Sequence, residues 1–223
     1  KTPELKAEYE NAGHVYLTSY MMPGYNLHMA KANCGIRVPS DLKGYKLICG
    51  SPEMQQLITD NQGAPLFLPP TDYFSTLEKG VADGLIAHMN VVSAFGCAPE
   101  LTKTHIQFSK DPSAGAYQYN LAVVFSEKFW NSLPEDLQKL FLDNAEQLGN
   151  ELAAFDQQLL NSYMDKTIEA GNEVIYLTDE QAAEWEKSME PIVQSSIKAL
   201  VDEGYTYAEQ LYKDIKAAVA NYK

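Results

Sequence analysis

Cysteine and histidine are the residue types in this chain that could carry out covalent chemistry. A cysteine thiolate activated by a histidine is a nucleophile, and the chain offers several such combinations. The candidates are Cys34, Cys49, Cys97, His28, His88 and His105. Their spacing requires no pair, and the sequence contains no Gly-rich phosphate loop, no His-Glu-x-x-His helix and no Gly-x-Ser-x-Gly turn. We therefore expect a protein that is not an enzyme and has no catalytic residues.

The cysteines also lack the spacing of a metal site. They leave two arrangements: three free, buried thiols, which we expect, or one disulfide with a remaining thiol. Asp72 or Asp83 with neighbouring carbonyl oxygens could hold a cation, but solvated turn carboxylates are the simpler interpretation. We expect neither a metal nor a cofactor.

The charge of the chain limits the classes of partner that it can bind. The formal net charge is −13, and Arg37 is the single arginine. Binding to nucleic acid requires clustered lysine and arginine, so no nucleic-acid partner is expected. No apolar run approaches the ~20 residues that a membrane span needs. Because 45% of the residues are hydrophobic and 21% are charged, the chain should fold rather than remain disordered.

Two runs of residues predict strands that end beside each other. In residues 39–47 (PSDLKGYKL), Ser40 can cap a short turn that ends at Gly44, and an apolar strand follows over 45–49. A helix over 73–79, with Phe74 and Leu77 on one face, then ends at Gly80 and leads into a strand over 81–86. A right-handed crossover would place both strands in one sheet with their carboxyl ends at the same edge, where α/β proteins usually bind ligands.

The remaining pattern also alternates between strands and helices, which is typical of an α/β fold. Further strands are expected at 14–20, 27–31, 66–68, 105–108, 117–125 and 174–177, and helices at 3–12, 52–61, 90–96, from 178 through Leu200, and 207–222. The capping box at Ser132–Glu135 predicts the start of one long helix that continues to Gly171. A second capping box lies at Thr178–Gln181.

The two runs at 39–47 and 77–84 resemble the middle of the periplasmic solute-binding proteins of tripartite ATP-independent (TRAP) transporters. The resemblance covers roughly residues 15–200. It implies a two-lobed periplasmic binding protein-like α/β fold with a long bracing helix and an incomplete N-terminal lobe. The chain starts at Lys1 with neither an initiator Met nor the apolar core of a secretory signal, so either a leader was removed or the chain is a fragment. We expect a fragment, because the resemblance implies roughly a further lobe of sequence upstream.

The domains implied by this resemblance are residues 1–31, a remnant of lobe I; 32–119, lobe II; and 120–223, a crossing strand, the bracing helix and C-terminal helices that pack on both lobes. It also implies an extracytoplasmic, periplasmic protein that is not itself membrane-spanning. Such a protein captures a small organic ligand and delivers it to the membrane permease subunits of the transporter.

The sequence departs from this family at the residues that usually hold a carboxylate. A pattern of Lys, aliphatic, Arg is usual after the Asp-Leu-Lys-Gly turn, but here the three residues are Lys46, Leu47 and Ile48. Ala87 stands where many members have Asn. A guanidinium donates two charge-assisted hydrogen bonds to a carboxylate, which an Ile cannot do. We therefore expect a less charged, more apolar or aromatic ligand than the usual acids.

The expected ligand-binding residues lie at or near strand ends that face the presumed opening. They are Tyr25, Ile48, Pro70, Phe74, Ala87, His88, Asn90 and Tyr119. Each also has a structural interpretation: Ile48 could be core, His88 a hydrogen-bonded or exposed histidine, Tyr25 the cover of a turn, and Phe74 the inward face of its helix. Arg37 is expected in a surface ion pair and is otherwise the fallback clamp for a carboxylate.

Two other functions remain open from the sequence. One is a protein-interaction or sensing module that binds a partner through the acidic helices at 132–223, for which an exposed apolar stripe would be the sign. The other is a cysteine-dependent enzyme, which the motifs do not support.

Overall fold

The computed structural model describes residues 3–111 and 113–221, and the chain forms two units. Unit 2 consists of Met21–Asn120 and Glu151–Glu190. Unit 1 consists of the described parts of Lys1–Tyr20, Leu121–Asn150 and Pro191–Lys223. Each unit is described separately below.

Unit 2 is built on a mixed sheet with the strand order β4-β3-β5-β2-β6-β8. The strands are β2 (Asn26–Met29), β3 (Lys46–Cys49), β4 (Ala64–Phe67), β5 (Gly84–Ala87), β6 (Thr104–Gln107) and β8 (Glu173–Tyr176). β3 pairs in parallel with β4 and β5, and β6 pairs in parallel with β8. β2 is antiparallel to both β5 and β6. The predicted parallel arrangement of the strands after Gly44 and Gly80 is thus confirmed, and their carboxyl ends lie at one edge.

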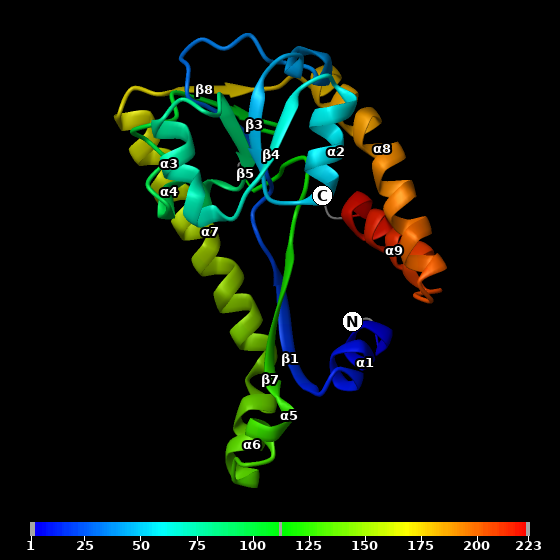
Figure 1. The fold of residues 1–223 in the computed structure, drawn as a ribbon. Helices are drawn as coiled ribbons and strands as arrows, with labels where there is room; N and C mark the ends of the chain where they lie inside the picture. Colours follow the sequence, from blue (N-terminus) through cyan, green and yellow to red (C-terminus); the bar gives the residue numbers. More distant parts are fainter. Residues whose placement is uncertain (1–2, 112, 222–223) are drawn as a thin grey trace. The chain divides into compact units, whose positions relative to one another are not determined.

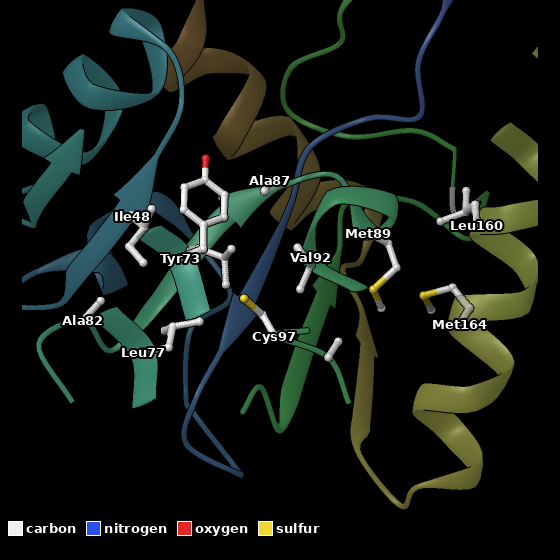
Figure 2. Packing of buried hydrophobic residues seen from close by; sticks show 12 residues of the cluster. Ile48, Tyr73, Leu77, Ala82, Ala87, Met89, Val92, Cys97, Leu160 and Met164 are labelled. Carbon is white, nitrogen blue, oxygen red and sulfur yellow. The ribbon is translucent and has the colours of Figure 1, made fainter. Parts of the chain in front are cut away.

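Helices cover both faces of this sheet (Figure 1). They are α2 (Pro52–Asp60), α3 (Tyr73–Glu78) after the 3₁₀ turn η2 (Pro70–Asp72), α4 (Met89–Ala94), the later part of α7 (Ala145–Glu169) and the first part of α8 (Asp179–Asp202). α3, α4 and α7 bury apolar side chains against one face, and Figure 2 shows Leu77, Val92 and Met164 in this cluster. α2 lies on the other side, where the Asn61 amide donates to Ser188 of α8.

Unit 1 contains a two-stranded sheet of β1 (His14–Met21) and β7 (Asn120–Ser126). Its helices are α1 (Pro3–Asn11), α5 (Glu127–Trp130), α6 (Glu135–Asp143) and α9 (Ala208–Asn221), together with the first residues of α7 and the last of α8. Phe125, Trp130 and Phe141 pack ring against ring, with centroids 5.0–6.4 Å apart. Across the described residues, no helix is both long and apolar enough to cross a membrane.

Several local predictions need correction. The long helix expected from Ser132 to Gly171 is divided at Asn144, whose backbone leaves the helical region (φ −103°, ψ 3°), into α6 and α7. Ser132 is not its cap, because its hydroxyl donates to the Phe129 carbonyl and α6 begins after Pro134. The turn η1 (Pro39–Leu42) begins after Val38 and is closed by the Asp41 carboxylate, not by Ser40.

Other local predictions are confirmed. The capping box at the start of α8 is formed, since the Thr178 and Gln181 side chains each accept a hydrogen bond from the other residue's backbone amide. Gly44 and Gly80 both have positive φ, 81° and 66°, where glycine carries no steric cost.

Two strands differ in bounds or place from the prediction. The strand expected over 117–125 begins only at Asn120. β2, expected within the segment 1–31, pairs in the middle of the unit 2 sheet.

Candidate ligand-binding site

The carboxyl ends of β3 and β5 and the amino end of β2 share one edge of the unit 2 sheet. Because β2 is antiparallel, Asn26 pairs with Ala87, so Tyr25 and His88 follow at neighbouring positions beyond the pair. The rings of Tyr25 and His88 lie 5.7 Å apart between centroids. Both residues are buried. This edge therefore brings together two of the residues that were predicted from the sequence to bind a ligand.

Tyr117 and Tyr119 join Tyr25 to form a tyrosine cluster. The three rings pack edge to face, with centroids 5.2–5.6 Å apart. The backbone holds them there, because the Tyr25 amide donates to the Tyr117 carbonyl at 2.7 Å. The two segments can approach so closely because Gly24 meets Gly115: a Cβ on Gly24 would lie 2.3 Å from the Gly115 nitrogen.

Two hydroxyls of this cluster, those of Tyr25 and Tyr119, lie beside Gly50, the residue after β3. The Tyr119 hydroxyl donates to the Gly50 carbonyl at 3.3 Å, and the Tyr25 side chain bonds to Tyr119. Tyr73, the first residue of α3, brings another hydroxyl to within 3.0 Å of where a Gly50 Cβ would stand. Tyrosines from three separate segments therefore meet at the end of one strand.

The hydroxyls of Tyr25, Tyr73 and Tyr117 stay neutral. Burial, and then the hydrogen bond to Tyr119, raises the pKa of Tyr25 far above its usual value of 10.0. Burial is also the largest cause that raises the pKa of Tyr73 and of Tyr117 to about 12 in each case. Burial lowers the pKa of His88 to about 4, so its imidazole is uncharged at neutral pH. The edge offers uncharged hydrogen-bonding groups on aromatic bodies.

His88 and Asn90 each carry a buried polar atom without a hydrogen-bond partner in the described part of the chain. These atoms are His88 Nδ1 and Asn90 Oδ1. The Asn90 amide nitrogen is engaged, because it donates to the Asp156 backbone carbonyl of α7 at 3.0 Å. Buried polar atoms are usually paired, so these two have unused capacity for a water or a ligand group.

The remaining predicted site residues lie in different surroundings. Ile48 is completely buried in the cluster between the sheet and α3, as Figure 2 shows, so its side chain offers no surface to a ligand in this structure. Ala87 is buried in the same cluster. Pro70 begins η2 and is half-buried. Phe74 is 39% exposed and therefore is not the inward face of its helix; Tyr73 and Leu77, four residues apart, are the inward pair.

Three residues of this edge were missed from the sequence: Gly50, Tyr73 and Tyr117. Tyr73 has a recognisable signal, because its spacing of four residues from Leu77 fits one helix face as well as the spacing of Phe74 and Leu77 does. Arg37 differs from its prediction, since its guanidinium donates to the Cys34 and Ile36 carbonyls and none of the ion pairs between described residues includes it.

The residues that could have formed a nucleophile are engaged elsewhere. All three cysteines are free and buried, as expected, and burial raises the pKa of Cys49 and of Cys97 to about 11. A neutral thiol is a poor nucleophile. His28 and His105 bond to each other through their Nδ1 atoms at 2.8 Å. Within the described residues, no cluster of three or more His, Cys, Asp or Glu side chains could hold a metal ion.

Two curated proteins are similar to part of this chain. A curated relative, the C4-dicarboxylate-binding periplasmic protein DctP of Shewanella loihica, is 29% identical over 72% of this chain and 46% of its own length. A solute-binding protein of Sulfitobacter sp. is 29% identical over 49% of this chain and 31% of its own length. The chain thus spans less than half the length of these curated relatives.

Solved structures share the fold. A marine metagenome TRAP solute-binding protein specific for aromatic acid ligands superposes with a TM-score of 0.84 at 20% identity, covering 97% of this chain and 66% of that one. The periplasmic ectoine-binding protein of the Halomonas elongata TRAP transporter superposes with a TM-score of 0.78 at 20% identity, covering 96% of this chain and 68% of that one. The α/β fold is therefore that of TRAP periplasmic binding proteins.

The sequence model of the family described as bacterial extracellular solute-binding protein, family 7, matches residues 1–199 of this chain. This family comprises binding proteins of transporters and not enzymes. The chain belongs to family 7 of the bacterial extracellular solute-binding proteins.

Proposed function

We propose that this chain is part of the periplasmic binding subunit of a TRAP-type secondary transporter, which captures a small organic solute and delivers it to the membrane permease. Family membership supports the role of a binding protein. The observation that carries the proposal is the neutral aromatic cluster at the carboxyl edge of the unit 2 sheet, formed by Tyr25, Tyr119 and His88. Ligands of α/β proteins bind at this edge.

The solute is an organic acid or a less charged, apolar or aromatic relative of one. Ile48 occupies the position where the family usually has an arginine, and Arg37 is engaged with backbone carbonyls. Aromatic rings bind flat, apolar bodies, and their hydroxyls orient the polar groups. The structurally similar protein specific for aromatic acids supports this class. The proposed contacts are Tyr25, Pro70, Phe74, Ala87, His88, Asn90 and Tyr119, with Ile48 in the wall behind them.

The test is to identify what the purified protein carries. Native mass spectrometry should find a bound small molecule, or a library of organic acids and their neutral relatives should raise the melting temperature. Tyr25→Ala should reduce this shift, whereas Tyr205→Ala, at an exposed tyrosine of unit 1, should leave it unchanged. Circular dichroism of the variant without ligand separates loss of binding from loss of fold. If no small molecule copurifies and none shifts the melting temperature, the proposal fails.

A protein-interaction module remains the second candidate, because α6 exposes apolar side chains. Leu140 is 56% exposed and Leu142 is 53% exposed, and no residue of α6 is buried. Large exposed apolar patches mark interaction sites. Replacing both leucines with glutamate should leave solute binding unchanged under our proposal. A loss of partner capture together with intact solute binding would assign this helix a separate role.

A further inference from the structure

The backbone conformation of Gly50 does not require a glycine. It is not among the described residues with positive φ, so another residue could adopt its conformation. The space beside it is occupied instead. A Cβ at Gly50 would lie 3.0 Å from the Tyr73 hydroxyl and 3.8 Å from the Tyr25 hydroxyl. The glycine therefore keeps room for tyrosine hydroxyls at the end of β3.

These hydroxyls form a directed arrangement. The Gly50 carbonyl accepts from Tyr119, so the Tyr119 oxygen can accept from Tyr25. No hydrogen bond within the described residues engages the Tyr73 hydroxyl. Figure 2 shows the Tyr73 ring extending out of the buried cluster with its oxygen at the far end. Tyr73 thus offers a free donor beside two hydroxyls whose positions are fixed.

A second observation points to a ligand at this place. His88, whose ring lies 5.7 Å from that of Tyr25, is 5% exposed, and its Nδ1 has no partner among the described groups. Burying a polar atom without a hydrogen-bond partner is unfavourable. A polar group of a ligand, held near the tyrosine hydroxyls, would remove this cost.

The charges around the cluster disfavour an anion. The groups that act on the pKa values of Tyr25, Tyr73 and Tyr117 include no lysine or arginine, and the charged one among them is Glu53, beside Tyr117. A carboxylate placed here would lose hydration without gaining an ion pair to a lysine or arginine that acts on these tyrosines. A carbonyl or hydroxyl oxygen does not have this disadvantage.

We propose that the hydroxyls of Tyr25, Tyr73 and Tyr119, gathered around Gly50, form a subsite that binds an uncharged carbonyl or hydroxyl oxygen of the solute in preference to a carboxylate. The proposal rests on the proposed function and specifies the ligand chemistry of that same site. Tyr73 supplies the free donor, and Gly50 supplies the space.

A pair of probes of the same shape tests the preference. Phenylacetamide and phenylacetate differ in that the amide is neutral and the carboxylate is charged. Isothermal titration calorimetry should show tighter binding of the amide, by about tenfold, which corresponds to about 1.4 kcal/mol. Tyr73→Phe, which keeps the ring and removes the hydroxyl, should abolish most of this difference. Gly50→Ala should do the same by displacing the Tyr73 hydroxyl. Tyr205→Phe, at an exposed site of unit 1, is the matched control and should change nothing.

The outcomes separate this inference from the proposed function. Equal or tighter binding of phenylacetate, no binding of the amide, or a preference that survives in Tyr73→Phe would overturn the subsite. The proposed function would still stand if native mass spectrometry found a bound solute whose occupancy falls in Tyr25→Ala. Melting temperatures of Tyr73→Phe and Gly50→Ala within a few degrees of the wild type would show that both variants are folded.

Discussion

Acid should destabilise unit 2 through the buried histidine pair. The Ala87 carbonyl can only accept, so His28 Nε2 carries the proton at this 3.1 Å contact, and His28 Nδ1 is an acceptor. His105 Nδ1 must then donate to it across 2.8 Å. Both rings are fully buried. A second proton on His28 would lie on Nδ1, opposite the His105 Nδ1–H, and a second proton on His105 would lie on Nε2, which faces the Asn172 amide nitrogen at 3.4 Å. The folded protein therefore holds this pair in its neutral form.

The magnitude follows from the pKa of His105. Burial, and to a smaller extent the Lys103 charge, lowers it from 6.5 to about 4. The folded state thus binds fewer protons than the unfolded state between these values, so the stability present above pH 6.5 is lost as the pH falls through 4. Between pH 7 and pH 5 the loss from this one residue is about 2 kcal/mol. The pKa of His28 is lowered as well, by burial first, which adds to the loss.

Urea unfolding at pH 7 and pH 5 measures this loss. His105→Asn places a non-titrating amide near the position of Nδ1. It should reduce the difference in unfolding free energy between pH 7 and pH 5 by about 2 kcal/mol. Gln107→Leu, at a buried residue of the same strand that does not titrate, is the matched control and should change stability equally at both pH values. If His105→Asn keeps the full pH dependence of the wild type, the neutral pair is not its source.

Three further changes test the packing of unit 2. Gly84→Ala should cost about 1–3 kcal/mol in urea unfolding, because its Cβ would lie 2.6 Å from a backbone oxygen of β2; a cost below about 0.5 kcal/mol would contradict this close approach. Ser51→Ala should cost about 1 kcal/mol by removing the cap of α2, and an unchanged midpoint would show that water replaces it. Cys49 and Cys97 should react with a disulfide reagent at pH 7.5 only in urea, because both are fully buried and burial raises their pKa to about 11; rapid reaction of the folded protein would refute this.

Local signals in the sequence predicted most of the elements of unit 2. The turn at Gly44 and the stop at Gly80 each depend on a backbone conformation that only glycine adopts without cost, and both were found where expected. The capping box at Thr178 likewise depends on residues three apart. The division of the long helix at Asn144 was not predicted, because the apolar spacing on its two sides continues across that residue.

The candidate site was only partly predictable for a different reason. The sequence placed Tyr25 and His88 at strand ends, and topology alone brings them together. Tyr117 was expected inside a strand over 117–125, but it lies before β7, which begins at Asn120. Its place depends instead on the contact of Gly24 with Gly115, which are far apart along the chain. Close backbone contacts between distant glycines leave no periodic pattern in the sequence, so they cannot be predicted from residue spacing.

The same glycines explain how neutral groups can be concentrated at one edge of a sheet. Gly24 and Gly115 let two backbones approach closely enough for the rings of Tyr25 and Tyr117 to pack edge to face, and Gly50 leaves room for a hydroxyl from a third segment. Burial raises the pKa of Tyr25, Tyr73 and Tyr117 further above its usual value of 10.0, so these hydroxyls can donate hydrogen bonds without carrying charge. An arginine clamp needs one side chain, whereas this arrangement needs three segments and the small residues that let them meet. Specificity at this edge should therefore be more sensitive to substitutions at the glycines than to changes of surface charge.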